Sequence, residues 1–453
     1  MIRLLSCVVA TLSAQAFASP AVTRFAIMEL PKLDYPGNIF TSPIAINEAG
    51  QITGESGSSV ASVGLHAFLW SPGQEMVDLD QSQWPATAGL TINQSAVMAG
   101  DATFCPDSNG ACASQPLVFY PDGAIIELGA VYVGYLVITG INEQDMVIYN
   151  RVIEEGASNI APIQWTPQGG ASTLPIPASS FSGYALDQND LGVVVGYSLG
   201  GGYQPLIWTD GTIASLQVEP GGDGWARSIN NAGVIVGESD FNGVTHATRW
   251  THYQAEPERV IEDPKTISSK SIRIYDDGTI IGTWNDSAGR IRPFRIAPDG
   301  AVDLFGLPNT DAGTIELIPL GVTPQGLVIC SHMNDFYQVQ PAIWIPNEGW
   351  VFTNDRLVGP GSNTSERPMD CNSKGQIITR GAAWTNPSFL DPMPPGDVNG
   401  DQTVGVDDIL NVLGSYGQCS PSPSRVCPAD VNDDGLVNVN DILGVIDNWG
   451  PGP

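Results

Sequence analysis

Two twelve-residue segments near the C-terminus carry oxygen-bearing side chains at matching positions, and this spacing suits a calcium ion. The segments span residues 397–408 and 430–441. Calcium takes about six to eight oxygen ligands, which a curled loop supplies from side chains at its first, third, fifth and last positions and from one backbone carbonyl. The sequence therefore predicts two Ca²⁺ sites, with the ligands Asp397, Asn399, Asp401, Thr403 (carbonyl) and Asp408 in the first, and Asp430, Asn432, Asp434, Leu436 (carbonyl), Asn438 (through a water) and Asp441 in the second.

The two loops differ at the sixth and ninth positions. Gly435 occupies the sixth position of the second loop, where a sharp turn favours positive φ, whereas Gln402 occupies it in the first. Gly405 offers no side chain at the ninth position, where the second loop has Asn438. We therefore expect the second site to bind calcium more strongly, and an empty first site remains an alternative.

An apolar segment with helical periodicity follows each loop, at residues 409–417 and 442–450. Pro394 and Pro395 precede the first loop and Pro428 precedes the second, and proline at these places opposes an entering helix. Two competing interpretations, an acidic solvated tail and an ordinary EF-hand, fit this pattern less well. The sequence predicts a pair of loop-helix units.

This pair resembles a type I dockerin, the module by which secreted bacterial proteins bind cohesin domains. The resemblance covers residues 396–450, with an offset of 33 residues between the copies. It implies that calcium holds the two units and that exposed helix faces contact a cohesin-like partner. It also places Val406, Asp407, Val439 and Asn440 near that contact. These residues differ from the Ser/Thr pairs of familiar dockerins, so the resemblance leaves partner specificity open.

The N-terminus has the pattern of a secretory signal peptide. Arg3 precedes an apolar run at residues 4–12, and small residues at 16–18 form a cleavage site. We expect residues 1–18 to be removed and the mature protein to be secreted, without membrane insertion. The net charge of −30, with only 18 Lys and Arg, excludes nucleic acid as a partner because binding it requires basic surfaces.

Six cysteines remain after cleavage, and export permits disulfides. Cys105 with Cys112 and Cys419 with Cys427 are plausible local pairs, which would leave Cys330 with Cys371. Sequence alone leaves other connectivities open.

The region between the signal peptide and the calcium loops is an array of repeats, each with a turn of the form Asn-x-x-Gly between short apolar strands. The repeated position, 41 to 49 residues apart, is held by Asn47, Asn93, Asn142, Asn189, Asn230, Tyr275, Thr323 and Asn372. A second signature, a strand ending in a large apolar residue, ends at Trp70, Tyr120, Trp165, Trp208, Trp250, Ile296, Trp344 and Trp384.

About four short strands in each repeat of this length are typical of a β-propeller blade. We expect a mainly β fold, with a β-propeller of about eight blades and a small α-helical calcium-binding domain. Seven blades remain the alternative. The segment 25–30 would supply the strand that completes the last blade and would remove an exposed sheet edge. Motifs such as His66-Ala67-Phe68 make the repeats similar to the HAF-type extracellular repeat, which implies export and a propeller-like fold but no defined activity.

No catalytic group is predicted in the repeats. The G-x-S-x-G stretch at 196–200 lacks the strand-turn-helix setting of a nucleophile elbow. The recurrent asparagines are predicted turn residues, and the recurrent tryptophans are predicted to pack between blades. Trp225, in a glycine-rich stretch, is the most loop-like aromatic and a candidate for stacking on sugar. Of the four histidines, His66, His246, His252 and His332, the first two occupy equivalent blade positions and are predicted to be structural.

The sequence thus predicts a signal peptide (1–18), a propeller (19–390), a linker (391–395) and a dockerin-like domain (396–453). We expect a secreted calcium-binding protein that docks a cohesin-type partner and carries a non-catalytic recognition or structural propeller into a polysaccharide-related assembly. The second candidate partner is polysaccharide itself. The alternative function is a carbohydrate-active enzyme, an O-glycosyl hydrolase with its active site in the propeller.

Overall fold

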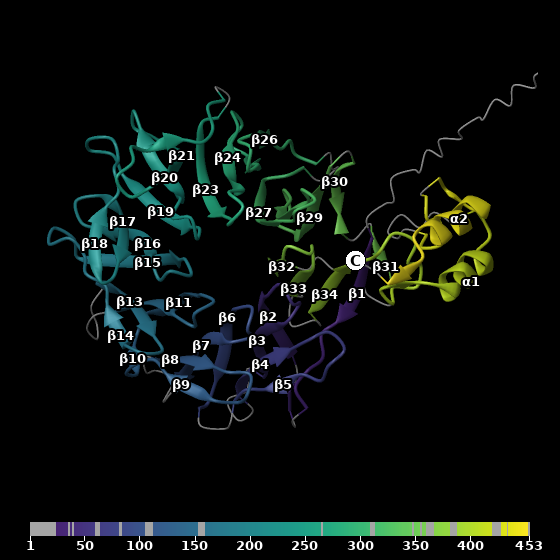
Figure 1. Cartoon of the computed structure of the whole chain (residues 1–453), viewed down its shortest axis with the longest axis horizontal. Helices are drawn as coiled ribbons and strands as arrows, with labels where there is room; N and C mark the ends of the chain where they lie inside the picture. Colours follow the sequence, from purple (N-terminus) through teal and green to yellow (C-terminus); the bar gives the residue numbers. More distant parts are fainter. Residues whose placement is uncertain are drawn as a thin grey trace, which may run out of the picture.

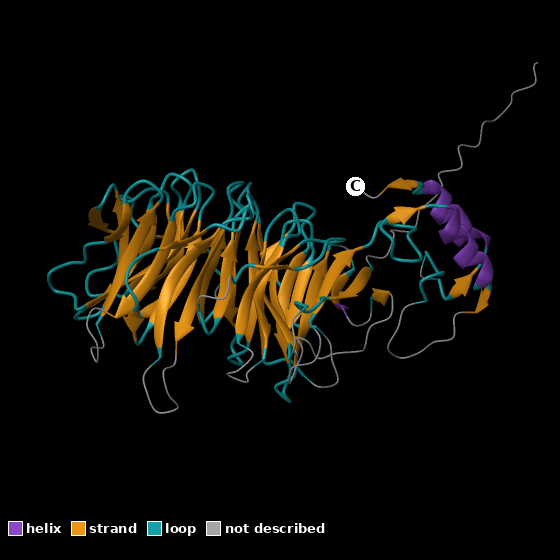
Figure 2. Cartoon of the chain, turned by 90° about the horizontal axis from the view of Figure 1, so that it is seen from below, coloured by secondary structure: helices purple, strands orange, loops and turns teal. Residues whose placement is uncertain are grey.

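The computed structural model describes residues 24–451 except 35–36, 39, 59–63, 81–83, 105–111, 153–158, 264–265, 309–312, 347, 354–355, 359–366, 381–386, 419–426 and 433. The predicted signal peptide lies outside the described residues. Within them, antiparallel sheets of mostly four strands follow one another around a ring, and a small helical unit lies beside it (Figure 1). The strands run across the thickness of the ring and loops cover both of its faces (Figure 2).

The first four blades are consecutive in the chain. Blade 1 contains β2 (Phe40–Ile46), β3 (Ile52–Gly57), β4 (Leu65–Trp70) and β5 (Val77–Asp78). Blade 2 contains β6 (Thr87–Ile92), β7 (Met98–Phe104), β8 (Ala113–Phe119), β9 (Ile125–Glu127) and β10 (Tyr132–Val133). Blade 3 contains β11 (Leu136–Ile141), β12 (Val147–Val152), β13 (Ile160–Thr166) and β14 (Gly170–Thr173). Blade 4 contains β15 (Ser182–Gln188), β16 (Val194–Leu199), β17 (Tyr203–Thr209) and β18 (Thr212–Ser215).

The next three blades repeat this order, and the first strand of each blade lies nearest the centre of the ring (Figure 1). Blade 5 contains β19 (Gly224–Ile229), β20 (Ile235–Phe241), β21 (Val244–Trp250) and β22 (Glu258–Arg259). Blade 6 contains β23 (Ser268–Ile274), β24 (Ile280–Asn285), β25 (Ile291–Ile296) and β26 (Val302–Leu304). Blade 7 contains β27 (Glu316–Val322), β28 (Val328–Met333), β29 (Val339–Ile345) and β30 (Gly349–Phe352).

Blade 8 joins the two ends of the ring. It contains β32 (Arg367–Cys371), β33 (Ile377–Arg380), β34 (Ser388–Pro392), the N-terminal β1 (Phe25–Glu29) and the short β31 (Leu357–Val358). β1 pairs antiparallel with β34 along its whole length. The predictions of a β-propeller with eight blades, and of closure by the N-terminal strand, are therefore confirmed.

The third strand of blade 8 differs from the prediction. That place is taken by β34 and not by the segment ending at Trp384, which lies outside the described residues. Leu390 of β34 pairs with Ile377 as Trp70 pairs with Ile52 in blade 1, so an aliphatic residue fills the aromatic position. Since β34 ends at Pro392, it takes up two residues of the predicted linker 391–395.

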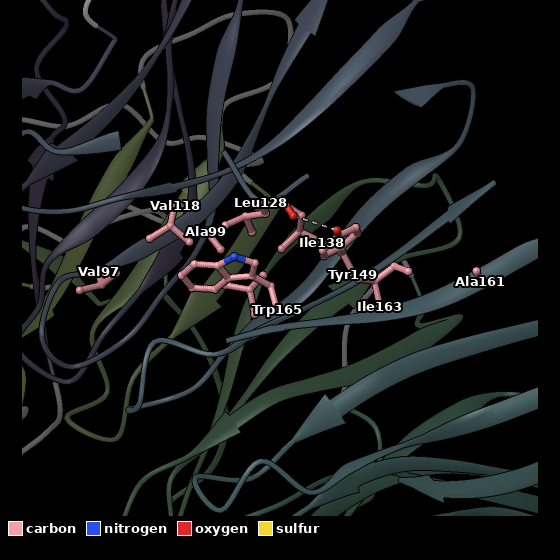
Figure 3. Close-up of a cluster of buried hydrophobic side chains, with 10 residues drawn as sticks. Val97, Ala99, Val118, Leu128, Ile138, Tyr149, Ala161, Ile163 and Trp165 are labelled. Carbon is pink, nitrogen blue, oxygen red and sulfur yellow. Dashed lines mark hydrogen bonds between the residues drawn. The ribbon is translucent and has the colours of Figure 1, made fainter. Parts of the chain in front are cut away.

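The hydrophobic cores lie between neighbouring blades, because each blade buries its apolar side chains against the next. Trp165 of blade 3 packs among Val97, Ala99 and Val118 of blade 2 (Figure 3). In the same cluster the hydroxyl of Tyr149 donates a hydrogen bond to the carbonyl of Leu128. The repeated tryptophan thus packs between blades, as the sequence predicted.

Two of the expected disulfide cysteines are free. Cys330 and Cys371 are buried thiols, so the predicted bond between them is wrong. Cys330 packs into the core between blades 6 and 7, whereas Cys371 packs into the core between blades 7 and 8, where each acts as a small apolar residue. Cys112 and Cys427 are disulfide-bonded, and their expected partners at positions 105 and 419 lie outside the described residues.

The turn asparagines connect each blade to the next. The Oδ1 atom of Asn142 accepts hydrogen bonds from the backbone N–H groups of Gln144 (3.1 Å) and Met146 (2.9 Å) and so closes the turn. Its Nδ2 atom donates to the carbonyl of Asn189 in blade 4, at 2.9 Å. An equivalent buried carboxamide links a blade to its successor at Asn47, Asn93, Asn142, Asn189, Asn230 and Asn372. Asn372 of blade 8 donates to the carbonyl of Asn47 in blade 1, so this link also joins the last blade to the first.

We expect Asn142→Ala to lower the thermal stability of the propeller, because each buried group left unpaired costs about 1–3 kcal/mol. Asn142→Thr should cost less. At the equivalent position of blade 7, the Thr323 hydroxyl accepts from the N–H of Leu327, so threonine retains one turn bond. Unfolding midpoints measured by circular dichroism check the order. Equal losses in the two variants would contradict the role assigned to the carboxamide.

Candidate calcium-binding site

The C-terminal unit consists of two loop-helix copies. The helices α1 (Val406–Gly414) and α2 (Val439–Asp447) each follow one predicted calcium loop. β35 (Thr403–Val404) pairs with β38 (Gly450–Pro451), and β36 (Gly417–Gln418) pairs with β37 (Leu436–Val437). Each loop is thereby joined to the segment that follows the other copy's helix. The two predicted loop-helix units are present, and with nine residues each these helices are too short to cross a membrane.

The shared core has internal symmetry. It contains Val398 and Val431, Val404 and Val437, and Val412 and Val445, and each of these pairs is separated by 33 residues. The apolar positions of the repeat thus meet at the centre, which leaves the polar loop positions outside. This arrangement follows from the duplicated sequence, because equivalent valines of the two copies pack together in one core.

The first predicted loop is curled by its own carboxylates. Asp397 is buried, and its Oδ1 and Oδ2 atoms accept from the N–H groups of Gly400 (2.7 Å) and Gln402 (2.9 Å). Burial raises the pKa of Asp397, and the negative charges of Asp408 and Asp401 raise it further. These three acidic groups therefore lie close enough to repel one another, and a cation between them would relieve that repulsion.

The last position of each loop ties the loop to its helix. Asp408 and Asp441 are buried, and one oxygen of each accepts from the N–H at the second loop position, that of Val398 or Val431, at 2.7 Å. The other oxygen of Asp408 accepts from the N–H of Gly405. This anchoring of the first helical turn adds a structural role to residues that the sequence identified only as ligands.

The two positions at which the loops differ behave differently in the structure. Gln402 adopts φ of 67° and Gly435 adopts 84°, so the sixth position requires the left-handed conformation in both loops. Glycine takes this conformation without cost, whereas Gln402 is strained. Asn438 is the N-cap of α2 and accepts from the N–H of Asn440 at 2.9 Å, whereas Gly405 has no side chain to cap α1. Both differences favour the second loop.

The donor set fits calcium. All predicted ligand atoms in the described loops are oxygens of carboxylates, amides or backbone carbonyls, which a hard divalent cation prefers. In the part of the chain that the structure describes, no group of three His, Cys, Asp or Glu side chains is arranged as a preformed metal site. Calcium at either loop therefore remains a prediction. It would neutralise the loop carboxylates and hold the loop against its helix.

An arginine that the sequence did not single out joins this unit to the propeller. Arg24 is buried just before β1, and its guanidinium donates to the carbonyls of Pro428 (2.7 Å) and Asp430. The carbonyl of Arg24 accepts from the N–H of Met393 at 2.8 Å. The strand that closes the ring and the start of the second calcium loop are therefore held by one side chain.

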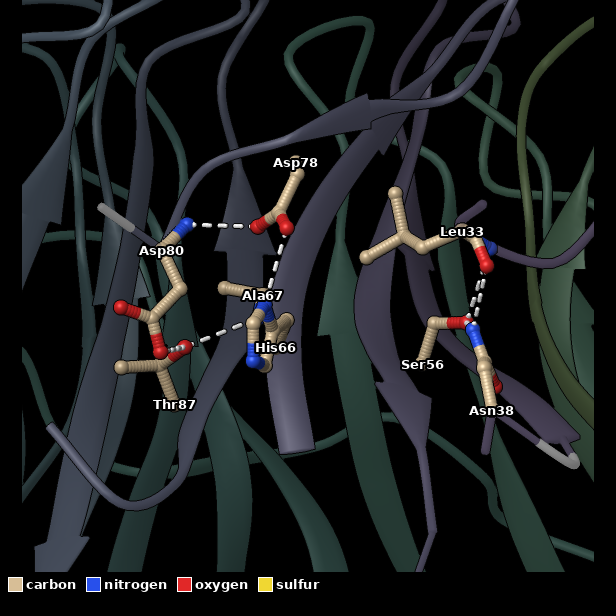
Figure 4. Close-up of polar contacts among 8 residues, drawn as sticks. All are labelled: Leu33, Asn38, Ser56, His66, Ala67, Asp78, Asp80 and Thr87. Carbon is tan, nitrogen blue, oxygen red and sulfur yellow. Dashed lines mark hydrogen bonds and ion pairs between the residues drawn. The ribbon is translucent and has the colours of Figure 1, made fainter. Parts of the chain in front are cut away.

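Three of the four histidines, His66, His246 and His332, lie in packing contacts of the blades, whereas His252 is exposed in a turn. His66 Nδ1 lies 2.8 Å from Asp78 Oδ2, next to bonds that join Thr87 of blade 2 to Asp80 and Ala67 (Figure 4). His332 lies against Thr314, and burial lowers its pKa to about 4. These contacts give both residues a structural role.

No family model matches the sequence, and a search of curated proteins gives no match. Solved structures with a similar fold include a streptogramin B lyase, with 12% identity over 82% of this chain and 98% of that one at a TM-score of 0.41. An oligogalacturonate lyase from Vibrio parahaemolyticus has 9% identity over 83% and 98% at a TM-score of 0.44. A prolyl endopeptidase has 10% identity over 78% of this chain and 54% of that chain, about half its length, at 0.49. These likenesses concern the fold alone.

We expect Asp430→Ala to abolish the stronger calcium-binding event, and Asp397→Ala to remove only the weaker one. Gln402→Gly should strengthen binding at the first loop by about 1–2 kcal/mol, because it relieves the left-handed strain. Calorimetric calcium titration of the full chain measures all three variants. Equal affinity at the two loops of the unaltered protein, or no gain in Gln402→Gly, would contradict this assignment.

We expect Arg24→Met to loosen the C-terminal unit from the propeller, because it removes two charge-assisted hydrogen bonds to the carbonyls of Pro428 and Asp430. Limited proteolysis should then separate the two parts faster than in the unaltered chain. Arg249→Met is the matched control, because Arg249 forms an exposed ion pair with Glu258 that contributes little. Equal cleavage rates in both variants would remove the role proposed for Arg24.

Proposed function

We propose that this protein is a secreted calcium-binding protein whose C-terminal module docks onto a cohesin-type domain. In this proposal the propeller is a non-catalytic recognition or structural unit that docking brings into an extracellular, polysaccharide-related assembly. One observation carries the docking proposal: both helices expose the same apolar stripe. It consists of Val406, Leu410 and Leu413 on α1, and Val439, Leu443 and Ile446 on α2, which are 48–59% exposed.

The stripe is a continuous helix face in each copy. Its members are spaced four and three residues apart, which places them on one side of an α-helix, away from the buried Val412 and Val445. Tyr416 and Trp449, also equivalent and about half exposed, extend the two stripes. A contiguous apolar surface on an otherwise acidic protein is typical of a partner site. Because the face is duplicated, two equivalent orientations of docking are available.

Calcium has a defined place in this proposal. Each stripe begins within the last positions of a loop, and Asp408 or Asp441 holds the loop to the first turn of the helix. Neutralising the loop carboxylates would fix the two helices in one geometry. Docking should therefore require calcium even though the apolar side chains bind no metal.

A hydrolytic propeller is the second candidate, and one feature favours it. Glu55 of β3 and Asp101 of β7 line a cavity of about 510 Å³ between blades 1 and 2. Burial raises the pKa of both carboxyl groups, and the charge of Asp101 adds to the shift at Glu55. Two carboxyl groups with raised pKa values at one cavity match the requirement for an acid and a base.

We expect the protein to be retained by an immobilised cohesin domain in calcium and released by a chelator. Leu410→Asp combined with Leu443→Asp should abolish retention. Leu191→Asp should not, since Leu191 is an exposed leucine on a propeller turn, 74% accessible. Retention of the double variant would contradict the proposed docking face. Hydrolysis of a polysaccharide panel that is lost in Glu55→Gln would instead establish the second candidate.

A further inference from the structure

Blades 4 and 5 share a partly exposed aromatic cluster. Tyr184 of β15 stacks on Tyr197 of β16, with ring centroids 4.8 Å apart and planes 17° apart. Tyr203 of β17 lies 5.8 Å from Tyr197 and 4.6 Å from Trp225 of β19. Trp225, which the sequence placed in a loop, is therefore the blade 5 member of a four-ring group.

The propeller fold does not require aromatic residues at these positions. Tyr184 and Trp225 both lie five residues before the turn asparagine, and the other blades have Ser42, Ala88, Val137, Lys270, Ile318 and Arg367 there. Tyr197 pairs with Tyr184, and the residues paired at the same register elsewhere are Glu55, Asp101, Asn150, Glu238, Thr283, Ser331 and Arg380. The four rings also lie outside the buried cores of their own blades. They are a local addition to the repeat.

A polar hollow lies beside the rings. Its volume is about 560 Å³, and Tyr203 belongs to both the aromatic cluster and the wall of the hollow. The wall also includes the side chains of Ser180, Gln204 and Gln217 and the glycines 200–202, beside four apolar residues and the carboxylates of Glu219 and Asp223. The Tyr203 ring and several neutral hydrogen-bonding groups therefore line the same hollow.

The charged groups near this hollow are already engaged. Asp223 accepts from the N–H of Tyr203 at 2.7 Å, and Glu219 accepts from the N–H of Asn242 at 2.7 Å. Arg227, which lies next to Tyr197, forms a two-point ion pair with Glu238. Among the described residues, no Lys or Arg lines the hollow, and its two wall carboxylates disfavour an acidic sugar.

From this arrangement we infer that the aromatic cluster of Tyr184, Tyr197, Tyr203 and Trp225, together with the adjoining hollow, binds a neutral polysaccharide. The C–H face of a pyranose ring would pack on the exposed tyrosine and tryptophan faces, and its hydroxyl groups would bond to the amides and hydroxyls of the hollow. This inference names the ligand class of the recognition propeller in the proposed function. It does not involve calcium or the docking helices.

The full chain is run in native gels that contain a neutral polysaccharide (glucan, mannan or xylan) or the acidic polygalacturonate. Each gel is run once with calcium and once with a chelator. We expect retardation by at least one neutral polysaccharide, unchanged by the chelator, and none by polygalacturonate. Tyr203→Ala should weaken that binding about tenfold, whereas Tyr253→Ala should leave it within about twofold. Tyr253 is the matched control because it is 46% exposed on blade 5 outside the cluster, while Tyr203 is 36% exposed.

Unfolding midpoints of Tyr203→Ala and Tyr253→Ala establish that both variants are folded. The variant Tyr203→Phe retains the ring and should bind as the unaltered chain does. Failure of every neutral polysaccharide to retard the protein would overturn the inference. Equal binding by Tyr203→Ala, or binding to polygalacturonate alone, would overturn it too. Binding that persists in chelator while cohesin docking fails would leave the glycan site standing and refute only the docking half of the proposed function.

Discussion

The ring is held by one repeated interaction, the buried carboxamide that closes a turn through Oδ1 and bonds to the next blade through Nδ2. A single blade exposes an apolar face, so its stability depends on the neighbour that this carboxamide fixes in place. Where Tyr275 replaces the asparagine, its hydroxyl accepts from the N–H of Val322 in blade 7 at 3.2 Å. A hydrogen bond between blades is thus retained at this position, although a hydroxyl replaces the carboxamide.

A second set of hydrogen bonds between blades is accepted by buried carboxylates. Asp187 accepts from the hydroxyl of Ser228 and the N–H of Ile229 in blade 5, and Asp370 accepts from the N–H of Ile46 in blade 1. Burial raises the pKa of both carboxyl groups, and the positive charge of Arg273, at the same repeat position in blade 6, lowers it. The carboxylates that the repeat places near the axis therefore act as structural acceptors.

The proposed functions occupy separate surfaces. The aromatic cluster lies on blades 4 and 5, which are across the ring from blade 8 and the helices α1 and α2 (Figure 1). Arg24 joins the closing strand to the second loop, so the helical unit is held against blade 8 and not suspended on a long tether. A glycan and a docking partner would then meet opposite sides of the molecule.

The sequence by itself predicted about eight blades, closure by the segment 25–30 and the loop-helix order, because these depend on local turn chemistry, strand alternation and motif spacing. It also located the strained Gln402. Tertiary structure alone decided that β34 replaces the segment ending at Trp384, that Cys330 and Cys371 face different cores, and that Arg24 reaches Pro428. It also decided that Trp225 meets Tyr197 and Tyr203. These contacts join residues far apart in the chain or on different strands, and no periodicity records which faces of two strands will meet.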